Sequence, residues 1–408
     1  MTHTDTGDRS GPILLAFSGG LDTSCCVPWL MEHTGRKVVT VTVNTGGIDD
    51  AAASALAERS EALGASRHIM VDARQQFFDD VIRFLIFGNV RRGATYPLCV
   101  GAERILQARL IAQMAGDGNG GAVAHGCTAA GNDQVRFEVA LRTVNPGVEV
   151  IAPVRDNAWG RDWQIAYLNE RGLPVPAGGG AYSINRGLWG TTIGGKETLT
   201  SAAGIPEEAW VVTRHAFDEP ASDLRLTVGF DAGVPVSLDG ETLDCVVLIE
   251  RLEAIAGTKG IGRGIHLGET ILGTKGRVAY EAPAAEVLLT AHRELEKLTL
   301  TGNQIRIKEP LAQTYGDLVH EGQHLDPVCR DIEALLAASQ SRVTGIVHLL
   351  LRPGSLFVEG VESVHSLMAA SRGAYGEAAG EWTASDALGL SKMRALPGML
   401  HARAGGGS

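Results

Sequence analysis

A glycine-containing turn between a strand and a helix is the feature that most constrains this chain. Residues 13–17 form an apolar run that predicts a short buried strand, and the largely apolar residues 25–32 predict a buried helix. Gly19 and Gly20 lie in the turn between them, where their small size lets the backbone approach a ligand closely. A helix start offers unpaired N–H groups and the positive end of a dipole. The turn therefore predicts a binding site for an anion.

The side chains of this turn indicate which anion it binds. Ser18, Thr23 and Ser24 supply hydroxyl groups, and Asp22 could hold Mg²⁺ among phosphate oxygens. The G-x-x-x-x-G-K spacing of a Walker A loop is absent, and the turn contains no lysine. The S-G-G-x-D-[ST] pattern resembles the pyrophosphate loop of the N-type ATP pyrophosphatases. We therefore expect ATP and Mg²⁺ here, with Asp22 as the metal ligand. A tight turn capped by Ser24, without a ligand, is the alternative.

Composition sets broad limits on the class of protein. The 408 residues fit two domains, and 44% hydrophobic residues are enough for a sizeable core. The net charge is −11 and no lysine/arginine cluster occurs, so no nucleic-acid partner is expected. No apolar run reaches transmembrane length and residues 1–11 lack a signal-peptide core, so no membrane partner is expected. The six cysteines lack metal-ligand spacing, which predicts reduced thiols in a cytoplasmic protein.

Strands and helices alternate along the first 165 residues. After the turn, residues 38–43 predict a second strand, and residues 50–63 and 75–87 carry helical periodicity. Residues 122–124 and 148–152 predict two further short, buried strands. This alternation predicts an α/β fold with a doubly wound parallel sheet and ligands at the carboxyl ends of its strands.

A second polar cluster follows the predicted strand at residues 122–124. The sequence from His125 to Glu138 reads H-G-C-T-A-A-G-N-D-Q-V-R-F-E. Helix capping by Asn132 or Asp133 would explain one polar residue of this cluster but not the whole set. We therefore interpret the cluster as part of the ligand site.

Together, these two motifs resemble those of the argininosuccinate synthase family. The resemblance extends from Leu14 to about Leu396, which is nearly the whole chain. Shorter family motifs recur in the same order at residues 151–155, 174–176, 182–184, 188–190, 260–263, 275–277, 280–283 and 341–345.

The resemblance implies three segments. These are a nucleotide-binding domain at residues 12–165, an α+β synthetase domain at residues 174–370 and a C-terminal oligomerisation segment at residues 371–400. In the family a helix of this last segment, here near residues 386–396, helps to build a homotetramer. An ordinary amphipathic surface helix is the alternative for residues 386–396.

The resemblance also implies a reaction. In the family, the ureido oxygen of citrulline attacks the α-phosphorus of ATP and expels pyrophosphate. The amine of aspartate then displaces AMP. This work requires positioning and charge stabilisation rather than a covalent nucleophile. The implied protein is a cytoplasmic ATP-dependent C–N ligase of arginine biosynthesis.

Most of the family's ATP and aspartate residues are present. For aspartate, Arg104 would pair with a donor carboxylate, and Thr128, Asn132 and Asp133 match the remaining positions. Asp22, Arg104 and Asp133 are the catalytic candidates. The residues that match the ATP site are Ala16, Phe17, Ser18, Gly19, Gly20, Leu21, Asp22, Thr23, Ser24 and Gly126. Two departures lie on the aspartate side, where Ala130 replaces a usual lysine and Val100 a usual threonine.

The citrulline residues are matched less completely. After the tyrosine that matches Tyr96 the family motif ends in L-G-T-S-x-A-R, whereas this chain has L-C-V-G-A-E-R from Leu98 to Arg104. The serine that would contact citrulline is therefore Gly101, and a second serine is Thr192. The residues that match the citrulline site are Tyr96, Asn132, Arg136, Ser183, Thr192 and Tyr280.

One further departure concerns the ammonium group of citrulline. The family has a glutamate twelve residues before the tyrosine that matches Tyr280, but position 268 is glycine here and Glu269 follows it. If the segment is a strand, this slip places Glu269 on the opposite face unless a bulge compensates. The acceptor is then either citrulline in a drifted pocket or another ureido or amide compound.

Two other functions are weaker alternatives. A tRNA-thiolating enzyme with the same turn would need catalytic cysteines and a basic surface, which are not evident in the sequence. A catalytically inactive nucleotide-binding or scaffolding protein is disfavoured by the intact ATP turn.

Overall fold

A five-stranded parallel sheet forms the first half of the protein. The computed structural model describes residues 11–176, 182–218, 222–377 and 379–405. The order β3-β2-β1-β4-β5 reverses direction between β1 and β4, and every neighbouring pair is parallel. The predicted doubly wound α/β fold is therefore confirmed. The strands are β1 (Ile13–Ala16), β2 (Val38–Asn44), β3 (Arg67–Asp72), β4 (Ala122–Ala124) and β5 (Glu149–Ile151).

Helices cover both faces of this sheet. Alternate residues of β1 face opposite sides of the sheet. Ile13 and Leu15 consequently pack in one apolar cluster, and Leu14 packs in another. The helices on the Ile13 side include α1 (Leu21–Thr34) and α8 (Arg161–Glu170), whereas α5 (Gly101–Met114) and α6 (Asp133–Val144) lie on the Leu14 side. The helix predicted at residues 25–32 begins earlier, at Leu21, inside the glycine turn. Three further helical elements of this half are α2 (Asp50–Ala62), the π-helical turn η2 (Ala115–Asn119) and the short helix α7 (Pro153–Asp156).

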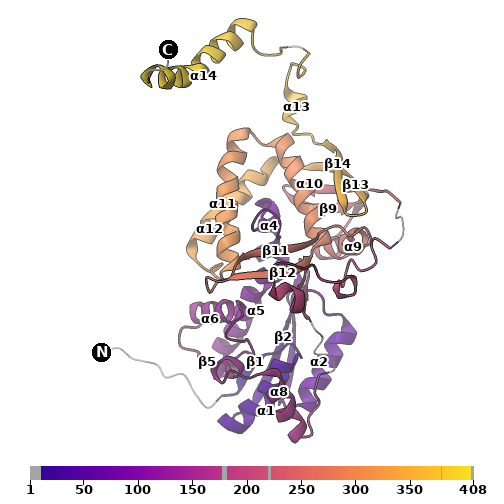
Figure 1. Ribbon diagram of the computed structural model, residues 1–408, viewed down its shortest axis with the longest axis vertical. Helices are drawn as coiled ribbons and strands as arrows, with labels where there is room; N and C mark the ends of the chain where they lie inside the picture. Colours follow the sequence, from indigo (N-terminus) through magenta and orange to yellow (C-terminus); the bar gives the residue numbers. More distant parts are fainter. Residues whose placement is uncertain (1–10, 177–181, 219–221, 378, 406–408) are drawn as a thin grey trace.

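The helix predicted at residues 75–87 contains a π-helical turn that the periodicity did not indicate. It consists of α3 (Arg74–Phe77), the π-helical turn η1 (Phe78–Ile82) and α4 (Arg83–Phe87). In Figure 1, α4 lies among the helices of the second half, and it contacts α10 (Pro283–Thr299) and α12 (Pro327–Ser339). One apolar cluster consequently runs through both halves. The division of the chain between residues 165 and 174 stays a prediction.

Two antiparallel sheets make up the second half (Figure 1). The four-stranded sheet has the order β11-β12-β7-β6 and the five-stranded sheet the order β10-β9-β8-β13-β14. The first comprises β6 (Ser183–Gly187), β7 (Gly190–Gly194), β11 (Arg263–Glu269) and β12 (Lys275–Glu281). The second comprises β8 (Leu224–Asp231), β9 (Val234–Leu238), β10 (Glu241–Thr242), β13 (Gly345–Arg352) and β14 (Ser355–Glu362). The remaining helical elements are η3 (Lys196–Leu199), η4 (Glu207–Ala209), α9 (Cys245–Gly257), α11 (Gly302–His320) and η5 (Gln340–Arg342).

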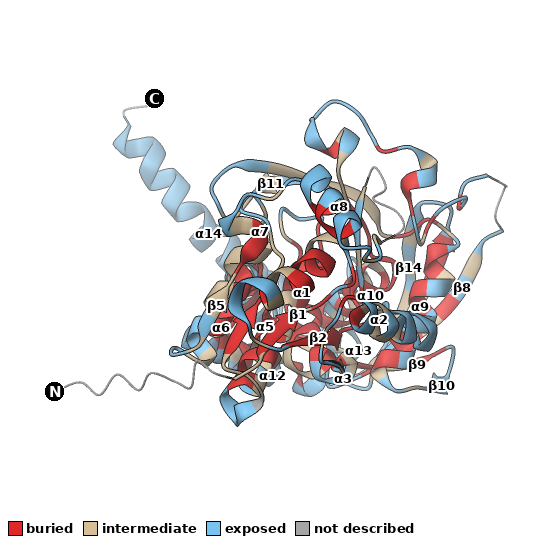
Figure 2. Ribbon diagram, turned by 90° about the horizontal axis from the view of Figure 1, so that it is seen from below, coloured by how far each residue is buried: buried red, intermediate tan, exposed pale blue. Residues whose placement is uncertain are grey.

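The last helices extend away from the two halves. Figure 1 shows α14 (Ala384–Ala404) separated from the body, beyond the short helix α13 (Leu367–Ala370). Every residue of α14 is exposed, whereas the strands and helices of the body contain many buried residues (Figure 2). Apolar side chains such as Leu388, Met393 and Leu400 are therefore in solvent in the single chain.

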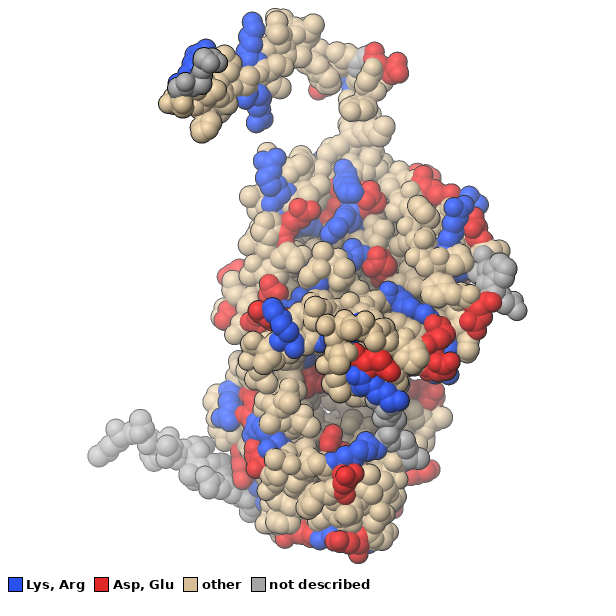
Figure 3. Space-filling model, viewed as in Figure 1, with Lys and Arg blue, Asp and Glu red and all other residues tan. Residues whose placement is uncertain are grey.

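Two surface properties of the described residues complete the fold. On the face shown in Figure 3, basic and acidic side chains are interspersed over both halves. Among the residues that the structure describes, no helix combines the length and the hydropathy needed to cross a membrane.

Candidate active site

A cavity of about 810 Å³ lies between the sheets of the two halves. Its walls come from the carboxyl ends of β1 and β2, the starts of α5 and α6, and β6, β7 and β11. This is where parallel sheets bind ligands, beside the point at which the strand order reverses. The predicted residues that line it are Ala16, Phe17, Ser18, Gly20, Asp22, Thr23, Tyr96, Arg104, Gly126, Thr128, Asn132, Asp133, Arg136, Ser183 and Thr192. Gly19, Leu21, Ser24 and Tyr280 are not among the lining residues.

Side-chain contacts to its backbone hold the glycine turn in shape. Gly19 has a φ of 70°, and a Cβ there would lie 2.4 Å from Leu56 Cδ2, so a larger residue would disturb the turn. Arg59 Nη1 donates to the Gly19 carbonyl oxygen at 2.6 Å, and Ser24 Oγ donates to the same oxygen at 3.4 Å. Ser24 therefore supports the turn from its buried side. The Oγ atoms of Ser18 and Thr23 are 3.3 Å apart beside the cavity, where they can reach a phosphate.

Asp22 is the residue of this turn that could hold a metal ion. Gln164 Nε2 donates to Asp22 Oδ1 at 2.7 Å and so fixes the carboxylate at the cavity wall. The described residues contain no cluster of three or more His, Cys, Asp or Glu side chains with metal-binding geometry. A lone carboxylate fits Mg²⁺, which is commonly bound through one or two carboxylates plus substrate phosphates.

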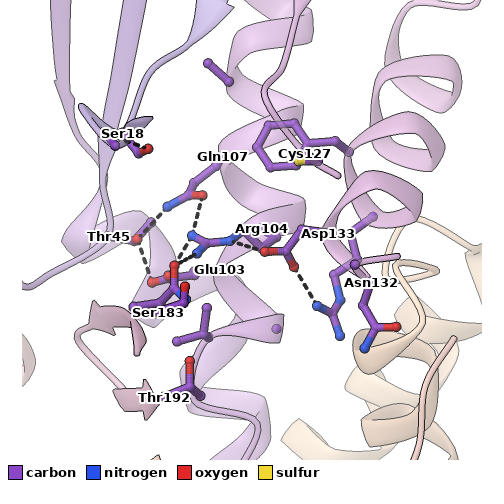
Figure 4. A pocket seen from close by; sticks show the side chains of 18 of the residues that line it. Ser18, Thr45, Glu103, Arg104, Gln107, Cys127, Asn132, Asp133, Ser183 and Thr192 are labelled. Carbon is purple, nitrogen blue, oxygen red and sulfur yellow. Dashed lines mark hydrogen bonds and ion pairs between the residues drawn. The ribbon is translucent and has the colours of Figure 1, made fainter. Parts of the chain in front are cut away.

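Arg104, in the first turn of α5, lies at the cavity wall and donates hydrogen bonds to neighbouring protein groups (Figure 4). Its Nε donates to Asp133 Oδ2 at 3.0 Å, and its Nη2 donates to Asn185 Oδ1 at 2.9 Å. Its Nη1 donates to Glu103 Oε1 at 2.9 Å and to Gln107 Oε1 at 3.0 Å. Burial disfavours the Arg104 charge, but the carboxylates of Asp133 and Glu103 raise its pKa overall. The arginine predicted to receive a substrate carboxylate already has two carboxylates of the chain beside it.

Glu103 is a site residue that the sequence analysis did not single out. Its side chain borders the cavity and is 2% exposed, and Thr45 Oγ1 donates to its Oε2 at 2.8 Å. Burial raises the pKa of Glu103 to about 7, although Arg104 and the Thr45 hydroxyl act in the opposite direction. The available signal was a glutamate at the position where the family motif quoted above has alanine.

Asp133 joins Arg104 to a second arginine. Arg136 Nη1 donates to Asp133 Oδ1 at 2.7 Å, so the carboxylate lies between two guanidinium groups. Burial raises the pKa of Asp133, but the two arginines outweigh it and hold the pKa below its ordinary value. Asn132 precedes α6, yet its side chain makes no capping bond there and instead accepts from the Ile271 N–H at 2.9 Å. Capping by Asn132 therefore does not account for this residue.

Aromatic and imidazole rings line the other end of the cavity. The His266 ring stacks on Tyr96 with a centroid separation of 5.3 Å, and Tyr280 packs against Tyr96 at 5.2 Å. Tyr280 donates its hydroxyl to the Thr95 carbonyl oxygen at 3.1 Å and lies behind the lining, so its predicted direct contact with substrate is not evident. His266 was not predicted from the sequence, because it lies outside the family motifs quoted above.

His320 is the second histidine at this end of the cavity. Arg136 Nε donates to the His320 carbonyl oxygen at 2.8 Å, and Arg136 Nη2 lies 3.3 Å from His320 Nδ1. Burial, with the nearby charge of Arg136, lowers the pKa of His320 to about 3, and burial also lowers the pKa of His266. Both rings are therefore neutral near pH 7. Neither Nε2 atom has a hydrogen-bond partner within the described part of the chain.

The slip at positions 268 and 269 is not compensated by a bulge. Strands β11 and β12 pair continuously from Arg263↔Glu281 to Glu269↔Lys275. Glu269 Oε1 pairs with Lys275 Nζ at 2.8 Å, and its side chain is 63% exposed. A Cβ at Gly268 would lie 2.5 Å from His266 Nε2, so the histidine ring fills the space that a side chain at 268 would need. The described carboxylates therefore leave this end of the cavity without a free partner for an ammonium group.

Comparisons with known proteins cover almost the whole chain. Residues 12–174 match the family described as "Arginosuccinate synthase N-terminal HUP domain", and residues 182–401 match "Arginosuccinate synthase C-terminal domain". The chain is 38% identical over 390 residues to the argininosuccinate synthase of Symbiobacterium thermophilum, covering 95% of this chain and 97% of the relative. It is 37% identical over 388 residues to that of Methanocaldococcus jannaschii, with the same coverage. It is also 37% identical over 396 residues to that of Lactiplantibacillus plantarum, covering 97% and 95%.

Proposed function

The chain belongs to the argininosuccinate synthase family and is an ATP-dependent ligase, and we propose that it joins an amine donor to an adenylated carbonyl in two steps. The observation that carries the proposal is that one cavity gathers the glycine turn, the Asp133 network and the Tyr96 end. ATP lies with its phosphates against the turn at the start of α1. An acceptor lies at the Tyr96 end, and a donor lies beside Asp133.

In the first step, the carbonyl oxygen of the acceptor attacks the α-phosphorus of ATP, and pyrophosphate leaves. The N–H groups of the glycine turn and the hydroxyls of Ser18 and Thr23 hold the phosphates. Asp22 would hold Mg²⁺, which, when bound, neutralises charge on the departing pyrophosphate. Gln164 fixes the Asp22 carboxylate for this task. The chain supplies positioning and charge stabilisation and forms no covalent bond to the substrate.

In the second step, the donor amine attacks the activated carbon, and AMP leaves. We propose aspartate as the donor, because Thr128, Asn132 and Asp133 line one side of the cavity. The Asp133 carboxylate is ionised and would orient the donor amine. Tyr96, Arg136, Ser183 and Thr192 are the residues that we propose for the acceptor, with Tyr280 supporting Tyr96 from behind.

The test is an aspartate-dependent assay of AMP and pyrophosphate across a panel of ureido and amide compounds. The proposal predicts equal amounts of AMP, pyrophosphate and an N-succinyl guanidine or amidine product. Formation of ADP and phosphate would overturn the first step. Equal activity with ammonium in place of aspartate would overturn the second.

A second candidate concerns the acceptor and is favoured by the geometry at Gly268. A buried ammonium that loses its charged partner typically binds about 2–5 kcal/mol more weakly. The position expected for that partner holds the His266 ring, and Glu269 pairs with Lys275 in solvent. A specialised relative would accept a ureido or amide acid that lacks an α-amino group. Arg136 would remain the positive group for its carboxylate.

Two substrates separate citrulline from this second class of acceptor. They are citrulline and 5-ureidopentanoic acid, which lacks only the α-amino group. The altered-acceptor hypothesis predicts that 5-ureidopentanoic acid equals or exceeds citrulline in kcat/KM. It also predicts that the double variant His266→Ala/Gly268→Glu shifts the preference towards citrulline, because the alanine provides room for the new carboxylate. A clear preference for citrulline that is lost in Glu269→Ala would instead identify citrulline as the acceptor.

We also propose a setting for the enzyme, which is a homotetramer in the cytoplasm. The exposed apolar side chains of α14 support an assembly of several copies. The six cysteines are free thiols, which supports a reducing compartment.

A further inference from the structure

The hydrogen-bonding capacity of Arg104 is almost fully used by the protein itself. A guanidinium group has five N–H donors. Asp133, Glu103, Gln107 and Asn185 accept four hydrogen bonds from Arg104, and two of these partners are carboxylates (Figure 4). A carboxylate of a donor needs two parallel N–H groups for a bidentate pair. Arg104 therefore cannot offer such a pair while all four partners are in place.

Glu103 is fitted into this position from several elements. It is held by the Thr45 hydroxyl after β2 and by Arg104 on its own helix. Gly187, at the end of β6, faces it, and a Cβ there would lie 2.2 Å from Glu103 Oε2. The glutamate thus needs a glycine opposite it. Because the motif of the family has alanine at this position, the additional carboxylate is a feature of this chain.

The charges around Glu103 are balanced before any donor arrives. Arg104 and Arg136 are positive, and Glu103 and Asp133 are negative, in one bonded network. Arg186 on β6 also borders the cavity. With alanine at position 103, the three remaining charged groups would retain one uncompensated positive charge for a donor carboxylate. With an ionised glutamate, the four groups retain none.

We propose that Glu103 determines donor selectivity: its carboxylate takes one N–H of Arg104 and neutralises the guanidinium charge, so a donor carboxylate competes with Glu103 for Arg104. This inference rests on the proposed function, since it concerns the donor site of the same ligase. Aspartate, which has two carboxylates, therefore binds more weakly while Glu103 is ionised. Protonation of Glu103 removes that disadvantage, because a neutral carboxyl competes weakly for the guanidinium. Binding of aspartate is therefore coupled to uptake of a proton.

The pH dependence follows from the state of Glu103. Burial raises the pKa of Glu103 to about 7, so the side chain is largely protonated at about pH 6 and ionised at about pH 8. The donor carboxylate raises this pKa further when it binds. The KM for aspartate should therefore increase as the pH rises above about 7, by up to about tenfold per pH unit for one coupled proton.

The variants Glu103→Ala and Glu103→Gln test the proposal, with Glu253→Gln as the matched control. Glu253 is also a buried glutamate with a pKa raised to about 7 by burial, but it does not line the cavity. At about pH 8 the proposal predicts that both Glu103 variants lower the aspartate KM about tenfold and lose its pH dependence. Glu253→Gln should keep the pH profile of the wild type. An unchanged or raised aspartate KM in both Glu103 variants would show that Glu103 only positions Arg104.

Donor selectivity supplies a second kinetic measurement. Alanine and β-alanine each lack one of the two carboxylates of aspartate. The analogue that lacks the carboxylate facing Arg104 gains nothing when Glu103 is removed. The proposal therefore predicts that the kcat/KM ratio of aspartate to one of the two analogues is higher in Glu103→Ala than in the wild type. Ratios to both analogues that are equal or lower in the variant would contradict it.

Direct titration of aspartate separates failure of this inference from failure of the proposed function. Protein loaded with a non-hydrolysable ATP analogue is titrated calorimetrically in buffers of different ionisation enthalpy. The proposal predicts proton uptake in the wild type and none in Glu103→Gln, whether or not any acceptor supports turnover. Equal proton uptake in both proteins would overturn this inference alone, whereas binding to neither protein would overturn aspartate as the donor and the inference with it. Thermal unfolding and affinity for the ATP analogue establish that each variant is folded.

Discussion

Gln164 Nε2, in α8, donates a 2.7 Å hydrogen bond to Asp22 Oδ1, in the first turn of α1. The two residues are 142 positions apart, and Gln164 is 2% exposed. The bond connects α8, which follows the last strand of the parallel sheet in sequence, to the glycine turn, which follows the first strand. The acidic group proposed for Mg²⁺ is therefore fixed by tertiary structure before a ligand binds.

Replacement of Asp22 by asparagine should remove turnover and preserve the fold. The amide keeps the size of the side chain but is a much weaker Mg²⁺ ligand than a carboxylate. We expect pyrophosphate release to fall at least about 100-fold, a loss of about 3 kcal/mol in transition-state stabilisation. Gln164→Leu keeps the Asp22 carboxylate but removes the hydrogen bond that holds it. This variant should need a higher Mg²⁺ concentration, with a smaller loss of kcat than Asp22→Asn. Turnover of Asp22→Asn within about threefold of the wild type would contradict the assignment.

The parallel sheet was predictable because its signals are local. Apolar runs such as residues 13–17 and 38–43 are long enough to indicate buried strands, and the glycine turn lies between a strand and a helix in sequence. The start of α1 was less predictable, because its first residues, Leu21 and Asp22, precede the apolar run from which the helix was predicted. The π-helical turn at residues 78–82 was not predictable, because apolar periodicity does not distinguish one wider turn from the α-helix around it.

The network around Arg104 was not predictable from local patterns. Arg104 bonds to Asp133, which is 29 positions later in the sequence, and to Asn185, which is 81 positions later. How many of its N–H groups have partners therefore depends on how β6 lies against α5. The resemblance indicated an arginine for a substrate carboxylate. Glu103 is its neighbour in the sequence, but the bonds from Arg104 to both Glu103 and Asp133 are seen only in three dimensions. The role of His266 was likewise not predictable, because its stacking on Tyr96 requires β11 to cross the end of the cavity.

Removal of the buried lysine at position 308 should destabilise the protein strongly. Lys308 Nζ contacts the Glu296 carboxylate, and the two side chains are 2% and 3% exposed. Breaking a buried pair by removing one partner typically costs about 3–5 kcal/mol, because a charge is left uncompensated. Lys308→Met should therefore lower the free energy of unfolding by about that amount, measured by urea denaturation. The double variant Lys308→Met/Glu296→Gln should recover much of the loss. Equal stability of the single variant and the wild type would contradict this account.

His320 should make stability fall at low pH. Burial and Arg136 lower the pKa of His320 to about 3 in the folded protein, below its ordinary value in the unfolded chain. The unfolded chain therefore binds one more proton, and stability is lost as the pH falls from about 6.5 towards 3. The contribution of one such group is about 1.4 kcal/mol per pH unit at most. We expect a smaller decrease between about pH 6.5 and 5.5 in His320→Gln than in the wild type. Identical slopes in the two proteins would exclude this role.

The C-terminal helix should control the oligomeric state. Its exposed apolar side chains are Leu388, Leu390, Met393, Leu396, Met399 and Leu400. Burial of such side chains against other copies is favourable by about 1.5–3 kcal/mol for each that is fully covered. Deletion of residues 371–408, or Met393→Glu with Leu400→Glu, should reduce the mass measured by light scattering. Ser391→Glu is the control on the same helix: it adds a charge of the same sign without removing an apolar side chain, and it should leave the mass unchanged. A full chain that is already monomeric would contradict the proposed tetramer.

Isotope transfer tests the central claim most directly, namely that the carbonyl oxygen of the acceptor attacks the α-phosphorus. The acceptor is labelled with ¹⁸O at its ureido or amide oxygen, and the products formed with ATP and aspartate are analysed by mass spectrometry. The account predicts one ¹⁸O atom in AMP and none in pyrophosphate, because the acceptor oxygen leaves with the adenylate. Unlabelled AMP, or ADP with labelled phosphate, would contradict the proposed reaction.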